Sequence, residues 1–454
     1  MIKEPGTLFA LVAALAAVGA CESKSGGTSD AAGAGGMPAN GAAGAHSEGG
    51  SAGIRSEAGS ANDAGGPPSP DTSELAGSGE TNDGAGDPTA GAGSGNEAGA
   101  DAGAAGDAGS PGSARPEYAY LTTYLGGIFA FSIDTLSGKP ELLPGSPVDA
   151  NAQIYAVSVD PAQRHLYVLD LLHKLDVFAI NADGSLPTTP ASSTPIQGGP
   201  VTLALDPEGR FAYVGTQTDE PKALLETFKL DAATGALTSA GAALELGGAP
   251  AYVAIDPTGH FAYLTESTQF GIWGYSINQT TGLLTPIDPT PFGGNAVFGG
   301  AIAFRPDAKF LYTTGNGLNA FAIDSATGKL ERVEGSPFNA NVSSDPTATN
   351  IAIEPRGKFL YATQFVPGSR VFGFSIDDAS GKLTPVPGNA LTLTAPYSAG
   401  VEPLGRFLYV GRDDGKLSVL AVKQSDGTIS EIDGSPVDHG GLQPELAFAR
   451  PIAR

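Results

Sequence analysis

Asp206-Pro207-Glu208-Gly209-Arg210-Phe211-Ala212-Tyr213 is a stretch that recurs, with small changes, along the later part of the 454-residue chain. The other copies are Asp256 to Tyr263, Glu354 to Tyr361 and Glu402 to Tyr409, with looser ones from Asp160 to Tyr167 and Arg305 to Tyr312. Together with Tyr120, the tyrosines that end these stretches lie 46 to 50 residues apart. A period of this length indicates a repeat protein in which each repeat is one structural unit.

A second marker keeps the same period. It is a glycine turn before an apolar residue, and it occurs at Gly138, Gly184, Gly235, Gly282, Gly328, Gly381 and Gly427. Around these markers each repeat contains an apolar run (such as 251–255), an aromatic run (261–265), an alternating run (272–277) and a short fourth segment. Alternation and Pro/Gly turns are typical of β-strands. Four strands in about 48 residues predict one blade of a β-propeller.

The number of repeats predicts an all-β, seven-bladed propeller of four-stranded blades over residues 116–454. The first repeat, from Tyr118, has no inner strand before it, whereas the last strand, 445–450, has no partners after it. We therefore expect the C-terminal strand to complete the N-terminal blade and to close the ring. Small residues two places before each turn acid suggest crowded inner strands: Ser158, Ala204, Ala254, Ala303, Ala352, Gly400 and, in the last strand, Ala447. Six blades with one stray repeat are the alternative.

Residues 22–115 have a different composition. They contain no Phe, Tyr or Trp, and their larger aliphatic residues are Met37, Ile54 and Leu75. Such a segment cannot bury enough apolar surface to offset the entropy of ordering it. We therefore predict three parts: a signal peptide (1–20), a disordered Gly/Ala/Ser-rich tether (21–115) that precedes the fold as a flexible linker, and the propeller (116–454).

The first residues predict export. Lys3 precedes a short apolar run, 8–18, which is too short to span a bilayer, and the run ends in Val18-Gly19-Ala20-Cys21. A cysteine at this position resembles the lipobox of bacterial lipoproteins, which implies that Cys21 is lipidated and holds the protein in the cell envelope, facing the periplasm or the exterior. An ordinary secreted protein with an incidental cysteine is the alternative.

The charge limits the choice of partners. The chain has a formal net charge of −24, and both the tether and the propeller region are acidic. Nucleic acids and anionic lipid surfaces bind cationic proteins, so we expect no nucleic acid, and membrane contact through the lipid anchor only. Five histidines and one cysteine show no zinc pattern, and we predict no metal and no cofactor. We expect a monomer.

The Phe-Leu-Tyr-Val strands, with Phe-x-Ile-Asp and Thr-Gly-Lys-Leu after them, resemble the lactonase-type seven-bladed propellers. This family includes one class of 6-phosphogluconolactonase and carboxymuconate cyclase. The resemblance implies two histidines, seven and five places before a turn acid. The five-place positions here hold Tyr155, Val201, Ala251, Gly300, Thr349, Tyr397 and Glu445, and the seven-place positions also lack histidine. The resemblance therefore predicts the architecture and does not carry over the catalytic residues.

Three residues are candidates for lactone hydrolysis, which needs a base and a partner for the oxyanion. Glu266, three places after Tyr263, approaches the position of the family's glutamate and could be the base; a solvated loop carboxylate is the alternative. Arg412 could hold the oxyanion, or form a local surface salt bridge in Arg412-Asp413-Asp414-Gly415. His439 could act in a loop on the ligand face, or be a plain loop histidine. We expect His165 and His260 to be exposed turn residues on the opposite face.

The remaining candidates stand near the starts of inner strands: Gln153, Tyr155, Tyr252, Asn350 and Tyr397. Tyrosine could stack on a sugar or hold a peptide there, and packing between blades is the alternative. Two functions follow. The first is a propeller that binds a protein, glycan or small molecule on its central face. The second is a lactone hydrolase that uses other residues than its relatives.

Overall fold

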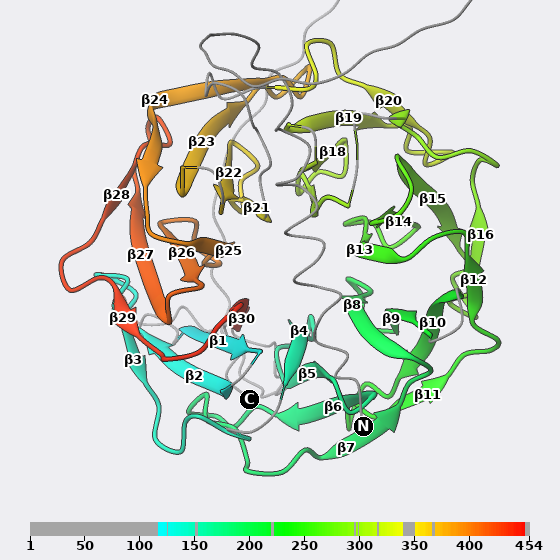
Figure 1. Ribbon diagram of the computed structural model, residues 1–454, viewed down its shortest axis with the longest axis horizontal. Helices are drawn as coiled ribbons and strands as arrows, with labels where there is room; N and C mark the ends of the chain where they lie inside the picture. The colour runs from blue at the N-terminus through cyan, green and yellow to red at the C-terminus, as the bar shows by residue number, and fades with distance from the viewer. Residues whose placement is uncertain are drawn as a thin grey trace, which may run out of the picture. The chain divides into compact units, whose positions relative to one another are not determined.

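The computed structural model describes residues 117–449, except 125, 150–152, 219–221, 295–296, 298, 316, 339–349 and 366–367. These residues belong to one unit, Ser110–Arg454. The predictions for residues 1–115, including the signal peptide, the tether and Cys21, lie outside the described residues. Within these ranges the strands form seven antiparallel sheets arranged around one axis, with the strands of each sheet stacked outward from it (Figure 1).

Each blade has an inner strand and three strands outside it. The inner strands, from the first blade to the seventh, are β30 (Glu445–Ala449), β4 (Ile154–Val159), β8 (Gly199–Leu205), β13 (Pro250–Ile255), β17 (Ile302–Phe304), β21 (Asn350–Ile353) and β25 (Pro396–Val401). The second strands are β1 (Glu117–Thr123), β5 (His165–Asp170), β9 (Phe211–Gln217), β14 (Phe261–Glu266), β18 (Phe310–Thr313), β22 (Phe359–Gln364) and β26 (Phe407–Arg412).

The third strands are β2 (Gly127–Ile133), β6 (Lys174–Ala179), β10 (Ala223–Leu230), β15 (Ile272–Ile277), β19 (Asn319–Ile323), β23 (Arg370–Ile376) and β27 (Lys416–Val422). The outer strands are β3 (Pro140–Leu142), β7 (Ser192–Pro195), β11 (Leu237–Ser239), β16 (Leu284–Pro286), β20 (Leu330–Arg332), β24 (Leu383–Thr392) and β28 (Ile429–Glu431). Two further strands, β12 (Leu244–Leu246) and β29 (Val437–Asp438), pair with β10 and β27.

The two ends of the propeller share its first blade, as the sequence predicts. Its strand order is β3-β2-β1-β30, and β30 pairs with β1 from Tyr118 opposite Ala449 to Thr122 opposite Glu445. This pairing closes the ring, and it removes the open edge that β1 would otherwise present. The seven-bladed prediction is confirmed, and the six-bladed alternative is wrong.

Hydrogen bonds between blades explain the two sequence markers. Each repeat tyrosine is 0–1% exposed, and its hydroxyl donates to the carbonyl of the turn glycine in the next blade at 2.7–3.0 Å. The seventh bond, from Tyr409 to Gly138, joins the last blade to the first at 2.7 Å. The small inner-strand residues lie directly opposite these tyrosines in the register, as Ala204 does opposite Tyr213. The tyrosine and glycine periods therefore agree because the two residues bind each other.

The turn glycines also need their lack of a side chain. Gly282 has a φ of 77°, and a Cβ atom there would overlap the ring of Phe211 in the preceding blade. The same overlap with an aromatic ring of the preceding blade occurs at the other six turn glycines. In the second blade that ring is His165, which occupies the aromatic position of the repeat. It is 6% exposed and its Nδ1 lies 3.1 Å from Asp160 Oδ2, so the expectation of an exposed His165 is wrong.

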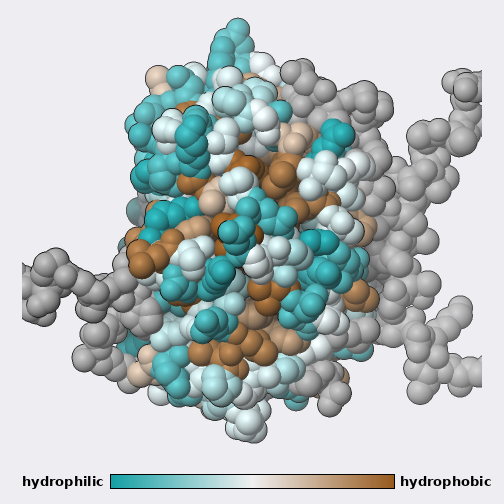
Figure 2. Space-filling view, turned by 90° about the vertical axis from the view of Figure 1, so that its left-hand side faces the viewer, coloured by the Kyte–Doolittle hydropathy of each residue, from teal (hydrophilic) through white to brown (hydrophobic). Residues whose placement is uncertain are grey.

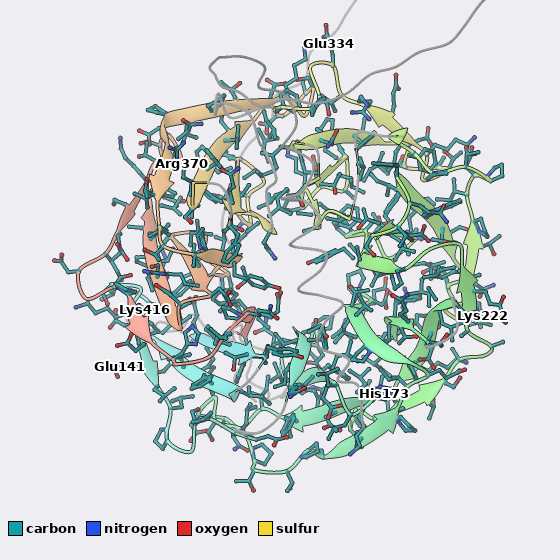
Figure 3. The ribbon with its side chains drawn as sticks, viewed as in Figure 1. Glu141, His173, Lys222, Glu334, Arg370 and Lys416 are labelled. Atoms are coloured by element: carbon teal, nitrogen blue, oxygen red, sulfur yellow. The ribbon has the colours of Figure 1, made fainter. Side chains whose placement is uncertain are left out.

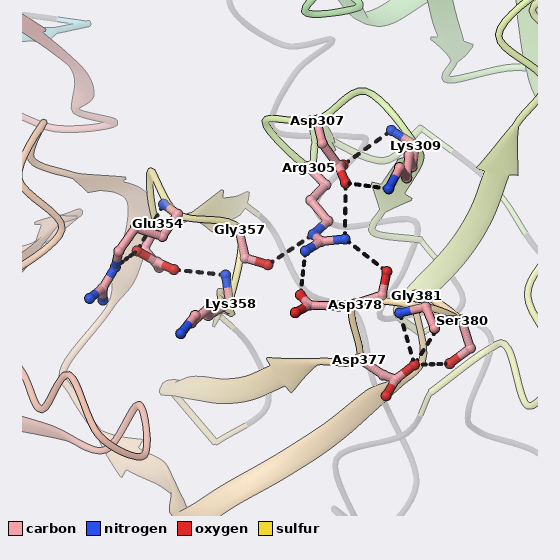
Figure 4. A network of polar contacts seen from close by, with 12 residues as sticks. Arg305, Asp307, Lys309, Glu354, Gly357, Lys358, Asp377, Asp378, Ser380 and Gly381 are labelled. Atoms are coloured by element: carbon pink, nitrogen blue, oxygen red, sulfur yellow. Dashed lines mark hydrogen bonds and ion pairs between the residues drawn. The ribbon is translucent and has the colours of Figure 1, made fainter. Parts of the chain in front are cut away.

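The buried turn acids stabilise the turns that join each inner strand to the second strand of its blade. Asp206 accepts hydrogen bonds from the amide and the Nε of Arg210, at 3.1 and 2.9 Å, and so closes its own turn. The fifth blade has Arg305 in place of the acid (Figure 4). Its guanidinium donates to the Gly357 carbonyl at 3.1 Å and pairs with Asp307 and Asp378. The basic residue thus links its blade to the turns of the sixth blade.

The outer strands expose part of their residues to solvent. In β24, for example, two buried residues are separated and followed by exposed and half-buried ones. The surface on the left of Figure 1 accordingly shows hydrophilic residues interspersed with separate hydrophobic patches (Figure 2). Across the described ranges, no helix is long and apolar enough to cross a bilayer.

Candidate functional site

The inner strands all start at one edge of the ring, and the second strands end there. The register shows this, because Ile154 lies opposite Asp170, Pro396 opposite Arg412 and Glu445 opposite Thr122. The start of an inner strand therefore lies beside the hairpin that follows a second strand. We call six side chains at this edge the axial mouth: Tyr124, Tyr155, Phe365, Tyr397, Asp413 and Glu445.

β-Bulges set the direction of the side chains at these strand starts. The register shifts near the start of β4, β8, β13 and β25, so one extra residue is accommodated there. The residues at the shift are Tyr155, Val201, Ala251 and Tyr397. A bulge locally twists the strand and redirects a side chain, and bulges are frequent beside binding sites. Two of the four thus present a tyrosine.

Both tyrosines form aromatic pairs with the preceding blade. The rings of Tyr155 and Tyr124 are edge-to-face with centroids 5.8 Å apart, and those of Tyr397 and Phe365 are edge-to-face at 6.4 Å. Tyr124 and Phe365 occupy equivalent places, four residues after the repeat tyrosines Tyr120 and Tyr361. All four side chains are half-buried. The packing holds each tyrosine in place while part of its surface stays open to solvent.

Glu445 lies between the two aromatic pairs around the ring, because β30 belongs to the first blade and β25 and β4 to its neighbours. Burial raises the pKa of Glu445 from 4.5 to about 8. Within the described residues, no hydrogen bond or ion pair to its carboxyl group offsets this burial. At neutral pH the group is therefore mostly protonated, and it can both donate and accept a hydrogen bond.

The other groups near Glu445 are acidic or phenolic. Burial raises the pKa of Tyr397, and the charges of Glu445, Asp413 and Tyr155 raise it further. Burial and then the charge of Glu445 raise the pKa of Tyr252 to about 12. Three basic residues in or next to the starts of third strands at this edge, Lys222, Arg370 and Lys416, lie toward the outside of the ring (Figure 3). The exposed His173 also lies away from the axis there (Figure 3).

The five predicted ligand-binding residues occupy this edge in different ways. Tyr155 and Tyr397 belong to the axial mouth. Tyr252 follows the bulge in β13 and packs against two hydrophobic clusters, one shared by the fourth and fifth blades and one by the fifth and sixth. The carboxamide oxygen of Asn350 accepts a hydrogen bond from the Ile351 amide at 2.8 Å, and the Gln153 carbonyl accepts one from the Leu171 amide at 2.9 Å.

The candidate base Glu266 ends β14 inside the protein. It is 1% exposed, and its Oε1 accepts a hydrogen bond from the Gly248 amide at 3.2 Å. Burial raises the pKa of Glu266, and the Trp273 side chain and the Gly248 amide partly offset this rise. The alternative of a solvated loop carboxylate is therefore wrong. Glu266 belongs to the fourth blade, three blades away from Arg412 and His439, and the structure does not bring the three candidates together.

Arg412 and His439 lie close together in the seventh blade, because the His439 amide donates to the Gly415 carbonyl at 2.9 Å. The Arg412 guanidinium pairs with Asp414 and donates to Ser418 Oγ at 3.3 Å, so the local ion pair is present, but Arg412 is 8% exposed and not on the surface. His439 is also 8% exposed, its ring meets Phe129 edge-on at 5.9 Å, and burial lowers its pKa. In the described ranges no cluster of three His, Cys, Asp or Glu side chains could hold a metal ion.

Sequence reasoning missed Glu445 as a site residue, although a signal was present. Glu445 is the one carboxylate among the seven residues that stand five places before the turn acids, where the family resemblance implies a histidine. The presence of a titratable side chain at this repeat position is the signal that could have identified Glu445.

Glu445 should make the stability of the protein depend on pH. Because its pKa in the folded chain lies above 4.5, the folded chain keeps a proton that the unfolded chain releases. This contribution to stability is fully present below about pH 4.5 and is lost as the pH rises through about 8. We expect Glu445→Gln to unfold at a higher temperature than the unsubstituted chain at pH 9, with a smaller difference at pH 5. Equal differences at both pH values in thermal melts would contradict this.

Comparison with known proteins places the chain in a family. The pattern of the family described as "Lactonase, 7-bladed beta-propeller" matches residues 211–298 and 301–441. The chain therefore belongs to the lactonase family of seven-bladed β-propellers, which confirms the predicted resemblance. No protein with a curated description gives a significant match.

Solved structures share the fold. A protein from Bacteroides fragilis assigned as a 6-phosphogluconolactonase is 20% identical, with a TM-score of 0.62 over 74% of this chain and 98% of that one. A similarly assigned protein from Bacteroides uniformis is 18% identical, with a TM-score of 0.63 over 73% and 99%. A periplasmic gluconolactonase from Pseudomonas aeruginosa is 18% identical, with a TM-score of 0.62 over 74% and 99%. Identities this low establish the architecture alone.

Proposed function

We propose that the propeller is a sugar-binding protein whose axial mouth holds a glycan or a smaller sugar. The observation that carries this proposal is the pair of edge-to-face aromatic contacts, Tyr124 with Tyr155 and Phe365 with Tyr397, on either side of Glu445. Aromatic rings offer apolar faces on which the C–H side of a sugar can pack, and tyrosine hydroxyls and a protonated carboxyl group can bind its hydroxyls.

The charge of the mouth favours a ligand without phosphate. The carboxyl groups of Glu445 and Asp413 do not attract an anion, and the basic residues Lys222, Arg370 and Lys416 lie toward the outside of the ring (Figure 3). A phosphorylated sugar lactone would need cations in contact with its phosphate. The proposed ligand is therefore a sugar without a negative charge.

Calorimetric titration of the full chain with a panel of monosaccharides and short oligosaccharides tests this proposal. Tyr155→Ala and Tyr397→Ala should each weaken binding about tenfold, because the loss of one stacking face is worth roughly 1.4 kcal/mol. Leu172→Ala is the matched control, since Leu172 is 73% exposed at the tip of the β5–β6 hairpin on the same edge. Equal losses in all three variants, or no sugar bound at all, would rule the proposal out.

Lactone hydrolysis is the second candidate, and the pKa of Glu445 favours it. A carboxyl group that titrates at about pH 8 suits general base catalysis near neutral pH, and the family name points to the same chemistry. Glu445 would remove a proton from the attacking water, so that the rate would rise with pH through about 8. Hydrolysis of neutral lactones that Glu445→Gln abolishes would support this function. Hydrolysis that persists in that variant would exclude Glu445 as the base, and no hydrolysis by the unsubstituted chain would exclude this function.

We also propose that the protein is displayed from the cell envelope through a lipid on Cys21. The sequence Val18-Gly19-Ala20-Cys21 supports this, as do the small residues before the cysteine. Several acyl chains would hold the protein stably at a membrane, because each buried methylene contributes about 0.8 kcal/mol. Membrane fractionation tests the anchor: the chain should sediment with membranes, and Cys21→Ser should not. Sedimentation of both would contradict it.

A further inference from the structure

Two kinds of side-chain pair alternate around one side of the axial mouth. Each pair combines the residue four places after a repeat tyrosine with a residue at the start of the next inner strand. From the sixth blade through the second, these positions hold Phe365 and Tyr397, then Asp413 and Glu445, then Tyr124 and Tyr155. The rings of the first two and of the last two are in contact, and the two acidic residues both lie near Tyr397. One acidic pair therefore lies between two aromatic pairs.

These pairs form one cluster. The Tyr397 hydroxyl is close enough to Glu445, Asp413 and Tyr155 for their charges to raise its pKa. Tyr252, from the far side of the ring, responds to Glu445 in the same way. Backbone groups hold Asp413 in place, since the Gln443 amide donates to Asp413 Oδ1 at 2.7 Å and the Asp413 amide donates to the Ala395 carbonyl at 2.8 Å.

The cluster has the features that bind an organic cation. Aromatic rings attract a cation to their faces through the quadrupole of the ring, and carboxylates attract it by charge. Arg412 is a neighbouring cation of the protein, but it does not bind the acidic residues of the mouth. Its guanidinium pairs with Asp414 and donates to Ser418 instead. We propose that the axial mouth binds a protonated amine, so that the sugar it recognises is an amino sugar. This inference rests on the proposed sugar-binding function and adds the chemical class of the ligand.

Binding of a cation should change the protonation of the mouth. Glu445 is mostly protonated at neutral pH because burial disfavours its charge, and a nearby ammonium group would favour the ionised form. The other titratable groups that face it are Tyr155, Tyr252, Tyr397 and Asp413. Burial raises the pKa of each of the three tyrosines, so they are already protonated and cannot take up the released proton. Asp413 accepts a hydrogen bond from the Gln443 amide. Binding should therefore release up to one proton to the solvent.

The experiment compares three sugars that share one ring. The measurements are made at about pH 6.5, which is below the usual pKa of amino groups, so the amine of glucosamine is protonated. At the same ring position glucose has a hydroxyl group and N-acetylglucosamine has a neutral amide. We expect calorimetry on the full chain to show glucosamine binding at least about tenfold more tightly than the other two. Titration in two buffers of different ionisation enthalpy should show proton release with glucosamine alone.

Glu445→Gln should remove both the preference for glucosamine and the proton release, so that glucosamine and glucose bind the variant with similar affinities. Glu141→Gln is the matched control, because Glu141 is exposed on the outer strand β3 and lies at the rim of the ring (Figure 3). Thermal melts of both variants confirm that they fold.

Three outcomes would overturn the inference. Equal affinities for glucosamine and glucose would show that the amine is not recognised, and would leave the sugar-binding function standing. Tighter binding of choline than of glucosamine would assign the mouth to a cation other than an amino sugar. If none of the sugars bound, the proposed function would fail together with the inference.

Discussion

A chain that ends at Pro444 is expected to lose the cooperative unfolding of the complete chain. The deletion removes β30, which pairs with β1 at five positions from Tyr118 to Thr122. Without it, Ala119, Tyr120 and Leu121, each 0% exposed, lose their cover, and β1 becomes an open edge. Exposing several such side chains costs about 2 kcal/mol each, which is comparable with the whole stability of many domains.

Circular dichroism melts and size-exclusion chromatography measure this effect. We expect the shortened chain to melt broadly at a much lower temperature and to aggregate. A chain that ends at Ala449 is the control, because it keeps every residue of β30. Sharp, similar melts for both chains would mean that β30 does not close the ring.

Gly282→Ala is expected to destabilise the protein by about 3 kcal/mol. Part of this loss, roughly 1–2 kcal/mol, comes from placing a Cβ atom at a φ of 77°, where L-residues are strained. The rest comes from the overlap of that atom with the Phe211 ring of the neighbouring blade, since overpacking typically costs 1–3 kcal/mol. The Tyr213 hydroxyl bonds to the Gly282 carbonyl at 3.0 Å, so any shift of the turn also weakens that contact.

Gly388→Ala separates the two causes. Gly388 has a similar φ of 64°, but a Cβ atom there would meet nothing within 4 Å. Urea unfolding should therefore give a loss of only about 1 kcal/mol for Gly388→Ala. Equal losses for the two variants would show that the aromatic contact does not hold the blades together.

The fold was predictable because its main contacts repeat. Each repeat tyrosine bonds to the turn glycine of the next blade, so tyrosines and glycines recur with the same period along the sequence. Closure by β30 was predictable because the first and last repeats are each incomplete and together make one blade. The expectation of an exposed His165 is wrong because the basic turn position belongs to Arg164. His165 stands two places before Tyr167, as Phe211 does before Tyr213, and its ring packs against Gly235 in the place of a phenylalanine.

The site was predictable only in part. Tyr155 and Tyr397 could be identified, because the repeat aligns them with each other. The two acidic residues could not, since Asp413 and Glu445 are 32 residues apart and come near the same tyrosine, Tyr397, only because the seventh and first blades are neighbours in the closed ring. The burial of Glu266 likewise depends on a contact with Gly248 in the segment before β13, which the local sequence does not reveal.

The titration of the Glu445 carboxyl group tests the central claim most directly, namely that this group sits in the axial mouth without a compensating charge. Carbon-13 NMR of the glutamate-labelled chain, with Glu445→Gln to assign the signal, follows the ionisation. We predict an apparent pKa of about 8. A pKa near the ordinary 4.5 would mean that solvent or a cation already compensates the charge, and it would contradict this description of the mouth.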